Sequence, residues 1–122
     1  MSVSYFVRYD IEVADLPAFM RRYREVHVPL VATWPGLRRM VLHTPLGWRD
    51  PFPVNAGRTV LMAQLEFDTP AALDEALATR ERAVAREDFQ KFAKFEGKVI
   101  HQAMAQDEVF RSPWLDGNEE GA

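Results

Sequence analysis

Two observations predict an α+β fold for this chain. Apolar side chains alternate with a period of two residues in four separate segments, which is typical of strands with one buried face. Between the first and second segments, and again between the third and fourth, the apolar period becomes that of an amphipathic helix. The resulting order is strand, helix, strand, strand, helix, strand. This order predicts the ferredoxin-like βαββαβ arrangement with a four-stranded antiparallel sheet.

The composition predicts one domain and excludes several function classes. The chain has 122 residues, of which 48% are hydrophobic, and its formal net charge is −3. We therefore expect residues 1–110 to form a single domain and residues 111–122 a polar C-terminal tail. The weak charge gives no reason to expect nucleic acid or an anionic membrane as a partner. No secretory signal or spanning apolar run occurs, which predicts a cytoplasmic protein, and the lack of cysteine excludes disulfides and thiolate chemistry.

The first half of the chain begins with a predicted strand at residues 3–9, VSYFVRY, and continues into the most regular helical pattern. Asp15 is a good N-cap, and Pro17 falls in the first turn, where a missing N–H is harmless. Pro29 should kink or restart the helix, and Trp34-Pro35-Gly36 should end it. The apolar stripe consists of Leu16, Phe19, Met20, Tyr23, His27 and Leu30.

The second half supplies the remaining elements. Residues 37–44 and 58–67 read as strands, separated by a long loop at residues 45–57. A second helix is predicted from Pro70, with a break near Thr79 and with Gly97 as a terminator, followed by a last strand at 98–106. Leu61, Ala63, Leu65 and Phe67 should share one face of the third strand.

The face of the sheet that two helices cannot cover is also partly apolar, although a face exposed to water should be polar. A second copy packing sheet to sheet would cover it, so we expect a homodimer. The long loop should border either the pocket or this interface, because it carries Trp48, Phe52 and Val54. The apolar residues on the uncovered face are Phe6, Val41, Val60, Met62, Ile100 and Met104.

Two segments, FMRRYREVHVPL at residues 19–30 and PGLRRM at residues 35–40, resemble the EthD family of dimeric α+β barrel proteins. The resemblance implies a dimeric α/β barrel with a ligand pocket in each subunit, between sheet and helices. Members and close relatives include a muconolactone methyl-isomerase and polyketide cyclases, which transfer protons without metal or cofactor. Other members accompany catabolic oxygenase systems and have no assigned chemistry. The family often has a tyrosine where this chain has Met40.

His27 is the candidate catalytic residue. It lies on the apolar stripe four residues after Tyr23 and therefore points toward the sheet. An imidazole there titrates near neutrality and can act as a general acid or base. The alternative is a core histidine bonded to a backbone carbonyl, for which the Glu25 carbonyl left free by Pro29 is a nearby acceptor.

The other candidates would shape the pocket. Each aromatic among them could equally be ordinary core. No metal or cofactor is expected, since the three histidines lack the spacing of metal ligands. The candidate ligand-binding residues are Tyr5, Tyr23, Met40, Phe89 and Phe92.

The remaining cationic and imidazole side chains have weaker assignments. If Met40 faces the helices, His43 faces the dimer partner. For His101 we favour a buried imidazole with a hydrogen-bond partner inside the protein. Arg8, Arg38 and Arg39 could hold a carboxylate, although such arginines are more often solvated or paired.

Three functions remain open at this point. The first is a cofactor-free isomerase or cyclase acting on a small, largely apolar or aromatic metabolite through His27. The second is a non-catalytic ligand-binding or accessory protein of a catabolic pathway that uses the same pocket. The third is a cofactor-free monooxygenase, which would need an indole such as Trp34 or Trp48, or a histidine, beside its substrate. No glycine-rich phosphate loop or GxSxG elbow occurs, which disfavours nucleotide chemistry and serine hydrolysis.

Overall fold

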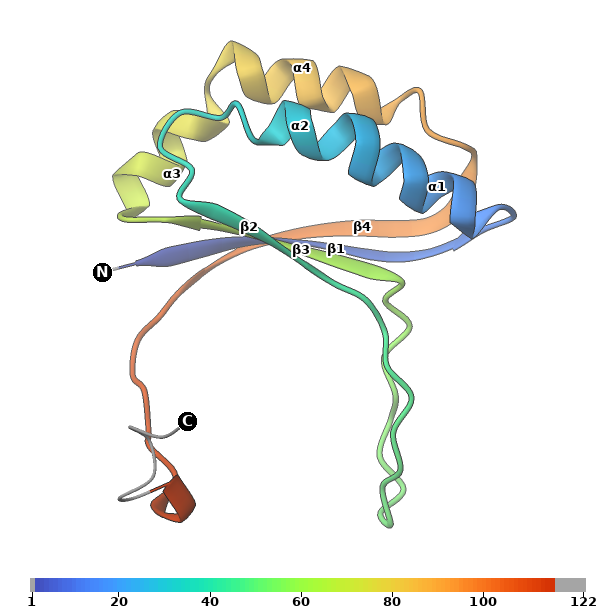
Figure 1. Cartoon of the computed structure of the whole chain (residues 1–122), viewed down its shortest axis with the longest axis vertical. Coiled ribbons are helices and arrows are strands. Elements are labelled where there is room, and N and C mark those ends of the chain that lie inside the picture. Colours follow the sequence, from blue (N-terminus) through green and yellow to red (C-terminus); the bar gives the residue numbers. More distant parts are fainter. Residues whose placement is uncertain (1, 116–122) are drawn as a thin grey trace.

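The computed structural model describes residues 2–115. In this part of the chain, four strands form one antiparallel sheet in the order β2-β3-β1-β4, and helices α1 to α4 lie on one of its faces (Figure 1). This is the predicted ferredoxin-like α+β arrangement. The strands are β1 (Val3–Val13), β2 (Arg39–His43), β3 (Leu61–Phe67) and β4 (Phe95–Ala105). The helical elements are α1 (Leu16–Arg22), η1 (Tyr23–His27), α2 (Val28–Val31), α3 (Pro70–Leu77), α4 (Arg80–Phe89) and η2 (Pro113–Leu115).

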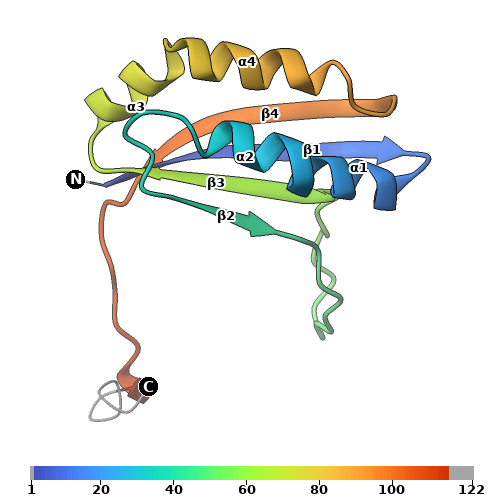
Figure 2. The same cartoon turned by 45° about the horizontal axis from the view of Figure 1, so that its top comes forward.

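The core lies between the sheet and the helices, as Figure 2 shows from an oblique direction. Strand β1 is central and pairs with both β3 and β4, so its inward side chains stand between two rows of partners. The alternation predicted for the third strand is confirmed, because Leu61, Ala63, Leu65 and Phe67 are all buried. The inward face of β1 consists of Val3, Tyr5, Val7, Tyr9 and Ile11.

The first helical stretch runs through α1, η1 and α2 without leaving right-handed helical geometry. The Asp15 carboxylate accepts a hydrogen bond from the backbone N–H of Ala18, which confirms the predicted N-cap. The helix restarts near Pro29 as predicted: α2 begins at Val28 with Pro29 in its first turn, after a π-helical turn in which the N–H of Val28 donates to the carbonyl of Tyr23. A π turn moves the hydrogen bonding by one residue, which lets the helix absorb a residue that lacks an N–H.

The second helical stretch is broken where the sequence predicts. The Thr79 hydroxyl accepts a hydrogen bond from the N–H of Arg82 and starts α4. The prediction for Gly97 is wrong: α4 ends at Phe89, and Gly97 lies inside β4 with a φ of 113°, opposite Ile11. A Cβ at Gly97 would lie 2.3 Å from the carbonyl oxygen of Asp10. Glycine is needed there for close backbone approach, which sequence spacing does not distinguish from a helix end.

Two segments extend away from the sheet on the side opposite helices α1 to α4: residues 44–60, between β2 and β3, and residues 106–115, which follow β4 (Figure 1). We call them the β2–β3 arm and the C-terminal arm. Both carry large apolar side chains in contact with water. No helix in the described residues has the length and apolar character needed to cross a bilayer. The exposed apolar residues of the arms are Leu46, Trp48, Phe52, Val54, Val109, Phe110 and Trp114.

Candidate functional site

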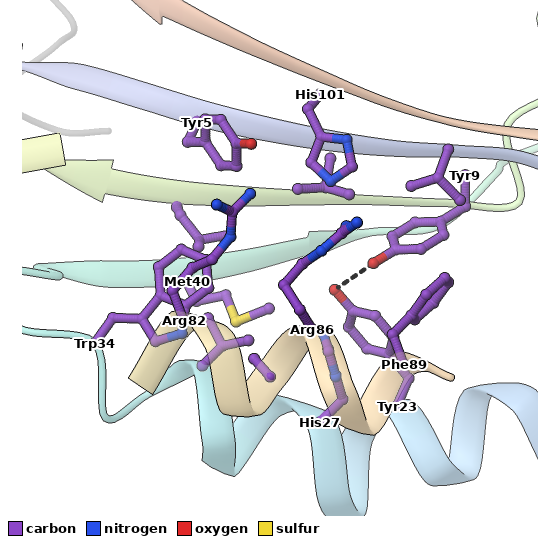
Figure 3. A pocket seen from close by; sticks show the side chains of 15 residues that line it. Tyr5, Tyr9, Tyr23, His27, Trp34, Met40, Arg82, Arg86, Phe89 and His101 are labelled. Carbon is purple, nitrogen blue, oxygen red and sulfur yellow. Dashed lines mark hydrogen bonds between the residues drawn. The ribbon is translucent and has the colours of Figure 1, made fainter. Parts of the chain in front are cut away.

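A cavity of about 50 Å³ lies between the inward face of the sheet and the helices (Figure 3). This is room for a few water molecules. On the side of α4 and β4, the lining residues Arg86 and His101 are exposed to solvent, which places the mouth of the cavity there. Its polar lining residues are Tyr5, Tyr9, Tyr23, His27, Trp34, Arg82, Arg86 and His101.

His27 forms one wall of the cavity and is 8% exposed. Its Nδ1 lies 3.1 Å from Oδ2 of Asp88, while Oδ1 of the same carboxylate accepts a hydrogen bond of 2.5 Å from Nη2 of Arg22. Asp88 is itself only 6% exposed and does not line the cavity. The imidazole therefore stands between a buried carboxylate and the cavity. The predicted alternative partner, the carbonyl of Glu25, is not the one that the ring uses.

The electrostatics of this pair favour a neutral imidazole beside an ionised carboxylate. Burial lowers the pKa of His27 below its ordinary value, and the hydrogen bond and charge of Asp88 oppose this effect without cancelling it. For Asp88, burial acts to raise the pKa, but hydrogen bonds from Arg22 and His27 outweigh it and the pKa is lowered. At neutral pH the Nδ1–H of His27 thus donates to Asp88, which leaves Nε2 as an unprotonated acceptor.

A pair of phenols lies beside this imidazole. The hydroxyl groups of Tyr9 and Tyr23 share a hydrogen bond of 3.4 Å, and the ring of Tyr23 lies 5.0 Å from that of His27 between centroids (Figure 3). Burial raises the pKa of Tyr9 to about 12, although the hydrogen bond from Tyr23 and the charge of Arg86 oppose it. Burial also raises the pKa of Tyr23 far above its ordinary value. Both phenols therefore remain protonated at neutral pH and can donate hydrogen bonds.

The structure brings five of the six predicted site residues to this cavity: His27, Tyr5, Tyr23, Met40 and Phe89 all line it. Phe92, the sixth, does not line the cavity. It is buried behind the wall, with its ring 5.4 Å from that of His27 between centroids. Phe92 therefore supports the imidazole by packing, and the geometry gives no basis for the predicted contact with a ligand.

Sequence reasoning missed Asp88 and Tyr9, as well as the two cavity-lining arginines of α4, Arg82 and Arg86. Asp88 occupies a position on the stripe set by Ala85 and Phe92, where a lone carboxylate among apolar residues was the available signal. Tyr9 shares the inward parity of Tyr5 on β1. Their positions in the sequence gave no indication that Asp88 bonds His27 or that Tyr9 bonds Tyr23.

The other two histidines lie on opposite faces of the sheet. His43 is on the helix-free face, as predicted, and its Nε2 lies 3.0 Å from Oε1 of Gln64. His101 is on the inward face, but it is exposed, so the interpretation of satisfied burial is wrong. It sits on an edge strand whose end no helix covers. Within the described residues, no three His, Asp or Glu side chains gather into a group that could hold a metal ion.

The fold and the cavity together define a ferredoxin-like domain that presents a histidine–aspartate pair to an internal cavity. The EthD domain matches residues 12–96. Since this match spans more than half of the chain, the chain belongs to the EthD family, as its resemblance at residues 19–30 and 35–40 indicated.

Solved structures agree with this assignment. An EthD family protein from Bacillus halodurans C-125 is 27% identical, with a TM-score of 0.70 over 88% of this chain and 100% of that chain. Hydroxynitrile lyase from Passiflora edulis is 13% identical, with a TM-score of 0.66 over 90% and 97% of the two chains. The cofactor-independent oxygenase SnoaB from Streptomyces nogalater is 17% identical, with a TM-score of 0.57 over 91% and 98%. The last two share the fold alone. Comparison with curated proteins gave no match.

Proposed function

We propose that the protein binds a small, largely apolar or aromatic metabolite in the cavity and moves a proton on it without a cofactor, with His27 as the general base and acid. One observation carries this proposal: Nδ1 of His27 is held at 3.1 Å from a buried carboxylate while the imidazole lines the cavity. A carboxylate in this position fixes the tautomer and the orientation of the ring, and it stabilises the imidazolium that forms after proton uptake.

The reaction that suits these groups is proton abstraction from a carbon next to a carbonyl. Nε2 of His27 takes the proton, and the electron pair of the broken C–H bond moves onto the carbonyl oxygen to give an enolate. The Tyr23 hydroxyl, which accepts a hydrogen bond from Tyr9, keeps its own O–H to donate to that oxygen. Where a C=C bond is conjugated with the enolate, return of the proton from His27 to the far carbon of that bond completes an isomerisation. In a cyclisation the carbanion attacks a second carbonyl of the same molecule, and the alkoxide that forms takes the proton back from His27.

The rest of the lining supports an apolar ligand. Met40, Phe89 and Val99 line the cavity together with apolar side chains of the inward sheet face. Met40 pairs with Leu65 across β2 and β3, which places its thioether at the cavity where other family members often carry a tyrosine. In this chain the phenol beside the histidine is supplied instead by Tyr9 and Tyr23.

The test is proton exchange on simple carbonyl compounds. In D₂O, phenylacetone and 1-indanone acquire deuterium next to the carbonyl, and NMR measures the rate with and without protein. We expect catalysis by the wild type and a loss of roughly 10²-fold or more in His27→Gln. His43→Gln, on the opposite face, is the matched control and should retain the rate. If His27→Gln binds these ketones as the wild type does and exchanges them equally fast, the catalytic proposal fails.

A wild type that binds the ketones without accelerating exchange would instead favour the non-catalytic ligand-binding protein. A cofactor-free oxygenase is a further alternative, because the indole of Trp34 lines the same cavity as His27 and SnoaB is an oxygenase of this fold. Oxygen uptake in the presence of an oxidisable phenol such as 1-naphthol, lost in Trp34→Phe, would distinguish it.

We also propose that two copies pair through the helix-free face of the sheet. A shallow groove on that face is lined by Phe6, Arg8, Met62, Ile100, Gln102 and Met104. The β2–β3 arm and the C-terminal arm extend on the same side of the sheet, where a second sheet would lie between them (Figure 1). Residues 45–56 of the β2–β3 arm do not line the internal cavity of their own chain, so we assign this arm to the interface.

A further inference from the structure

The lining of the cavity is electrostatically one-sided. Arg82 and Arg86 belong to it, whereas none of its residues is aspartate, glutamate, asparagine or glutamine. Most of its polar atoms are therefore donors or positive charges, and the carboxylate of Asp88 lies behind His27 and is already paired with Arg22. A wall with two guanidinium groups and no acid of its own is suited to a ligand that carries the negative charge.

The two arginines lie four residues apart on α4, and Figure 3 shows both guanidinium groups reaching from that helix toward the sheet. Like charges at this spacing repel each other, so their common orientation is unfavourable unless an anion joins them. Arg82 makes one long hydrogen bond, 3.4 Å, from Nη1 to the carbonyl of Leu77. Arg86 makes no hydrogen bond or ion pair with any described residue.

Other arginines of the chain show the contrast. Arg8 pairs with Asp10, Arg38 with Asp68, and Arg39 with Glu66. These three are the arginines for which the sequence left a carboxylate-binding role open, and each already has a carboxylate within its own chain. Neither Arg82 nor Arg86 has a carboxylate partner among residues 2–115.

Two neighbours extend this donor surface. Trp34 is 7% exposed and lines the cavity, and its buried indole N–H has no hydrogen-bond partner within the described residues. His101 faces the same opening, and its pKa is lowered by burial and then by the charges of Arg86 and Arg82. A buried donor without an acceptor is unfavourable in the empty protein and becomes satisfied when a ligand supplies an acceptor.

We propose that Arg82 and Arg86 form a carboxylate-binding site at the mouth of the cavity, so that the ligand is a monocarboxylate whose apolar part extends inward toward His27. A guanidinium binds a carboxylate through two parallel N–H donors, which makes arginine the suitable residue at this position. The carboxylate would remain at the rim, where Arg86 is exposed, and so would avoid the cost of full burial. The inference rests on the proposed function only in that both place the ligand in the same cavity.

The experiment compares three probes of one shape with different charge. Binding of benzoate, benzamide and phenylphosphonate is measured by NMR titration at low ionic strength, and the side-chain Nε–H signals of the arginines report the location. We expect benzoate to bind about tenfold or more tightly than benzamide, since hydrogen bonds to a charged group are the stronger ones. Raising the salt concentration should reduce this preference, because Arg86 is exposed.

The variants Arg86→Gln and Arg82→Gln should each weaken benzoate binding while leaving benzamide unchanged, and the double variant should bind both probes equally. Arg80→Gln, at an exposed position of α4 that does not line the cavity, is the matched control and should keep the preference. Should the double variant fail to fold, Arg86→Gln alone carries the test.

Equal binding of benzoate and benzamide by the wild type, or binding of neither, would overturn the inference. Tighter binding of phenylphosphonate than of benzoate would overturn the assignment to a carboxylate. His27→Gln separates the two proposals. A preference for benzoate that survives in this variant while ketone exchange is lost supports both, whereas exchange without any preference leaves the proposed function standing and removes this inference.

Discussion

The two faces of the sheet differ in composition and in what covers them. On the inward face, Tyr9, Leu61 and Leu65 are buried by helices of the same chain. On the helix-free face, Met62 is half-buried and Met104 is 49% exposed, and they share this face with polar residues such as Arg8 and Gln64. An apolar residue on a strand therefore contributes to folding only where another element of the chain covers it, and otherwise it is available for association.

The largest difference between the faces should appear on truncation. Phe67→Ala on the inward face removes a side chain that is 1% exposed and should cost about 3–5 kcal/mol of unfolding free energy. Met62→Ala on the helix-free face should cost less than half as much in the isolated subunit. Its effect should depend on protein concentration if that face pairs with a second copy. Denaturant unfolding at two concentrations checks both, and equal concentration-independent losses would contradict the comparison.

Gly97 tests how tightly the backbone of the inward face is packed. Gly97→Ala should destabilise the protein by roughly 1–3 kcal/mol, because the φ of 113° is unfavourable for alanine and the added Cβ would lie 2.3 Å from the Asp10 carbonyl oxygen. Gly47→Ala, where a Cβ meets nothing within 4 Å, is the control and should change stability little. Thermal unfolding of both variants makes the measurement. A wild-type midpoint in Gly97→Ala would show that β1 and β4 separate easily here.

Val41→Arg tests whether the helix-free face is an interface. Val41 lies on this face, half-buried, opposite Gln64. A charge there should dissociate the proposed dimer, because it would be buried without a partner, while the subunit keeps its stability within about 0.5 kcal/mol. Light scattering at micromolar concentration gives the mass, and circular dichroism gives the fold. A wild-type monomer, or a dimer unaffected by Val41→Arg, would remove the interface from this face.

The smallest effect concerns pH and the buried histidine. The pKa of His27 is lowered in the folded state, so the unfolded chain takes up this proton first. Stability should therefore be complete above about pH 6.5 and should fall as the pH drops toward the folded pKa. The lowered pKa of Asp88 adds a loss of the same sign below about pH 4. We expect less than about 1 kcal/mol between pH 7 and 5.5.

The check is a series of denaturant midpoints in wild type, His27→Gln and His101→Gln, since the pKa of His101 is lowered as well. In His27→Gln the denaturant midpoint should depend less on pH than in the wild type, because the contribution of the imidazole is removed. NMR titration of the His27 imidazole should give a pKa below 6.5. A pKa above that value would mean that Asp88 outweighs burial and that the imidazole is charged at neutral pH.

Most of the fold could be predicted from local patterns, because the signals were close in the sequence. The N-cap Asp15, the break at Thr79 and the inward alternation of Leu61 to Phe67 each depend on residues within a few positions of one another. Gly97 was assigned incorrectly because glycine marks any position with positive φ, and its contact with Asp10 involves a distant strand.

In the candidate site, too, features that depend on nearby residues could be predicted, and features that depend on distant residues could not. The direction of His27 followed from its stripe with Tyr23, and the parity of Tyr5 followed from strand alternation. The partners of His27 did not, because Asp88 is 61 residues away and reaches the imidazole only through the packing of α4 against η1. The exposure of His101 could not be predicted either, since the alternation of β4 does not show which of its inward positions the helices cover.

By itself the sequence determined the order of the elements, the residues that face inward and the family, since periodicity, capping and short motifs act over one or two turns of chain. Only the tertiary structure decided the chemistry of the cavity. Three features depend on contacts between elements that are distant in the sequence. They are the carboxylate of Asp88 behind His27, the hydrogen bond between Tyr9 and Tyr23, and the position of Arg82 and Arg86 at the mouth of a cavity formed by the sheet and the first helix. Their protonation and charge depend on the burial and neighbours that folding creates.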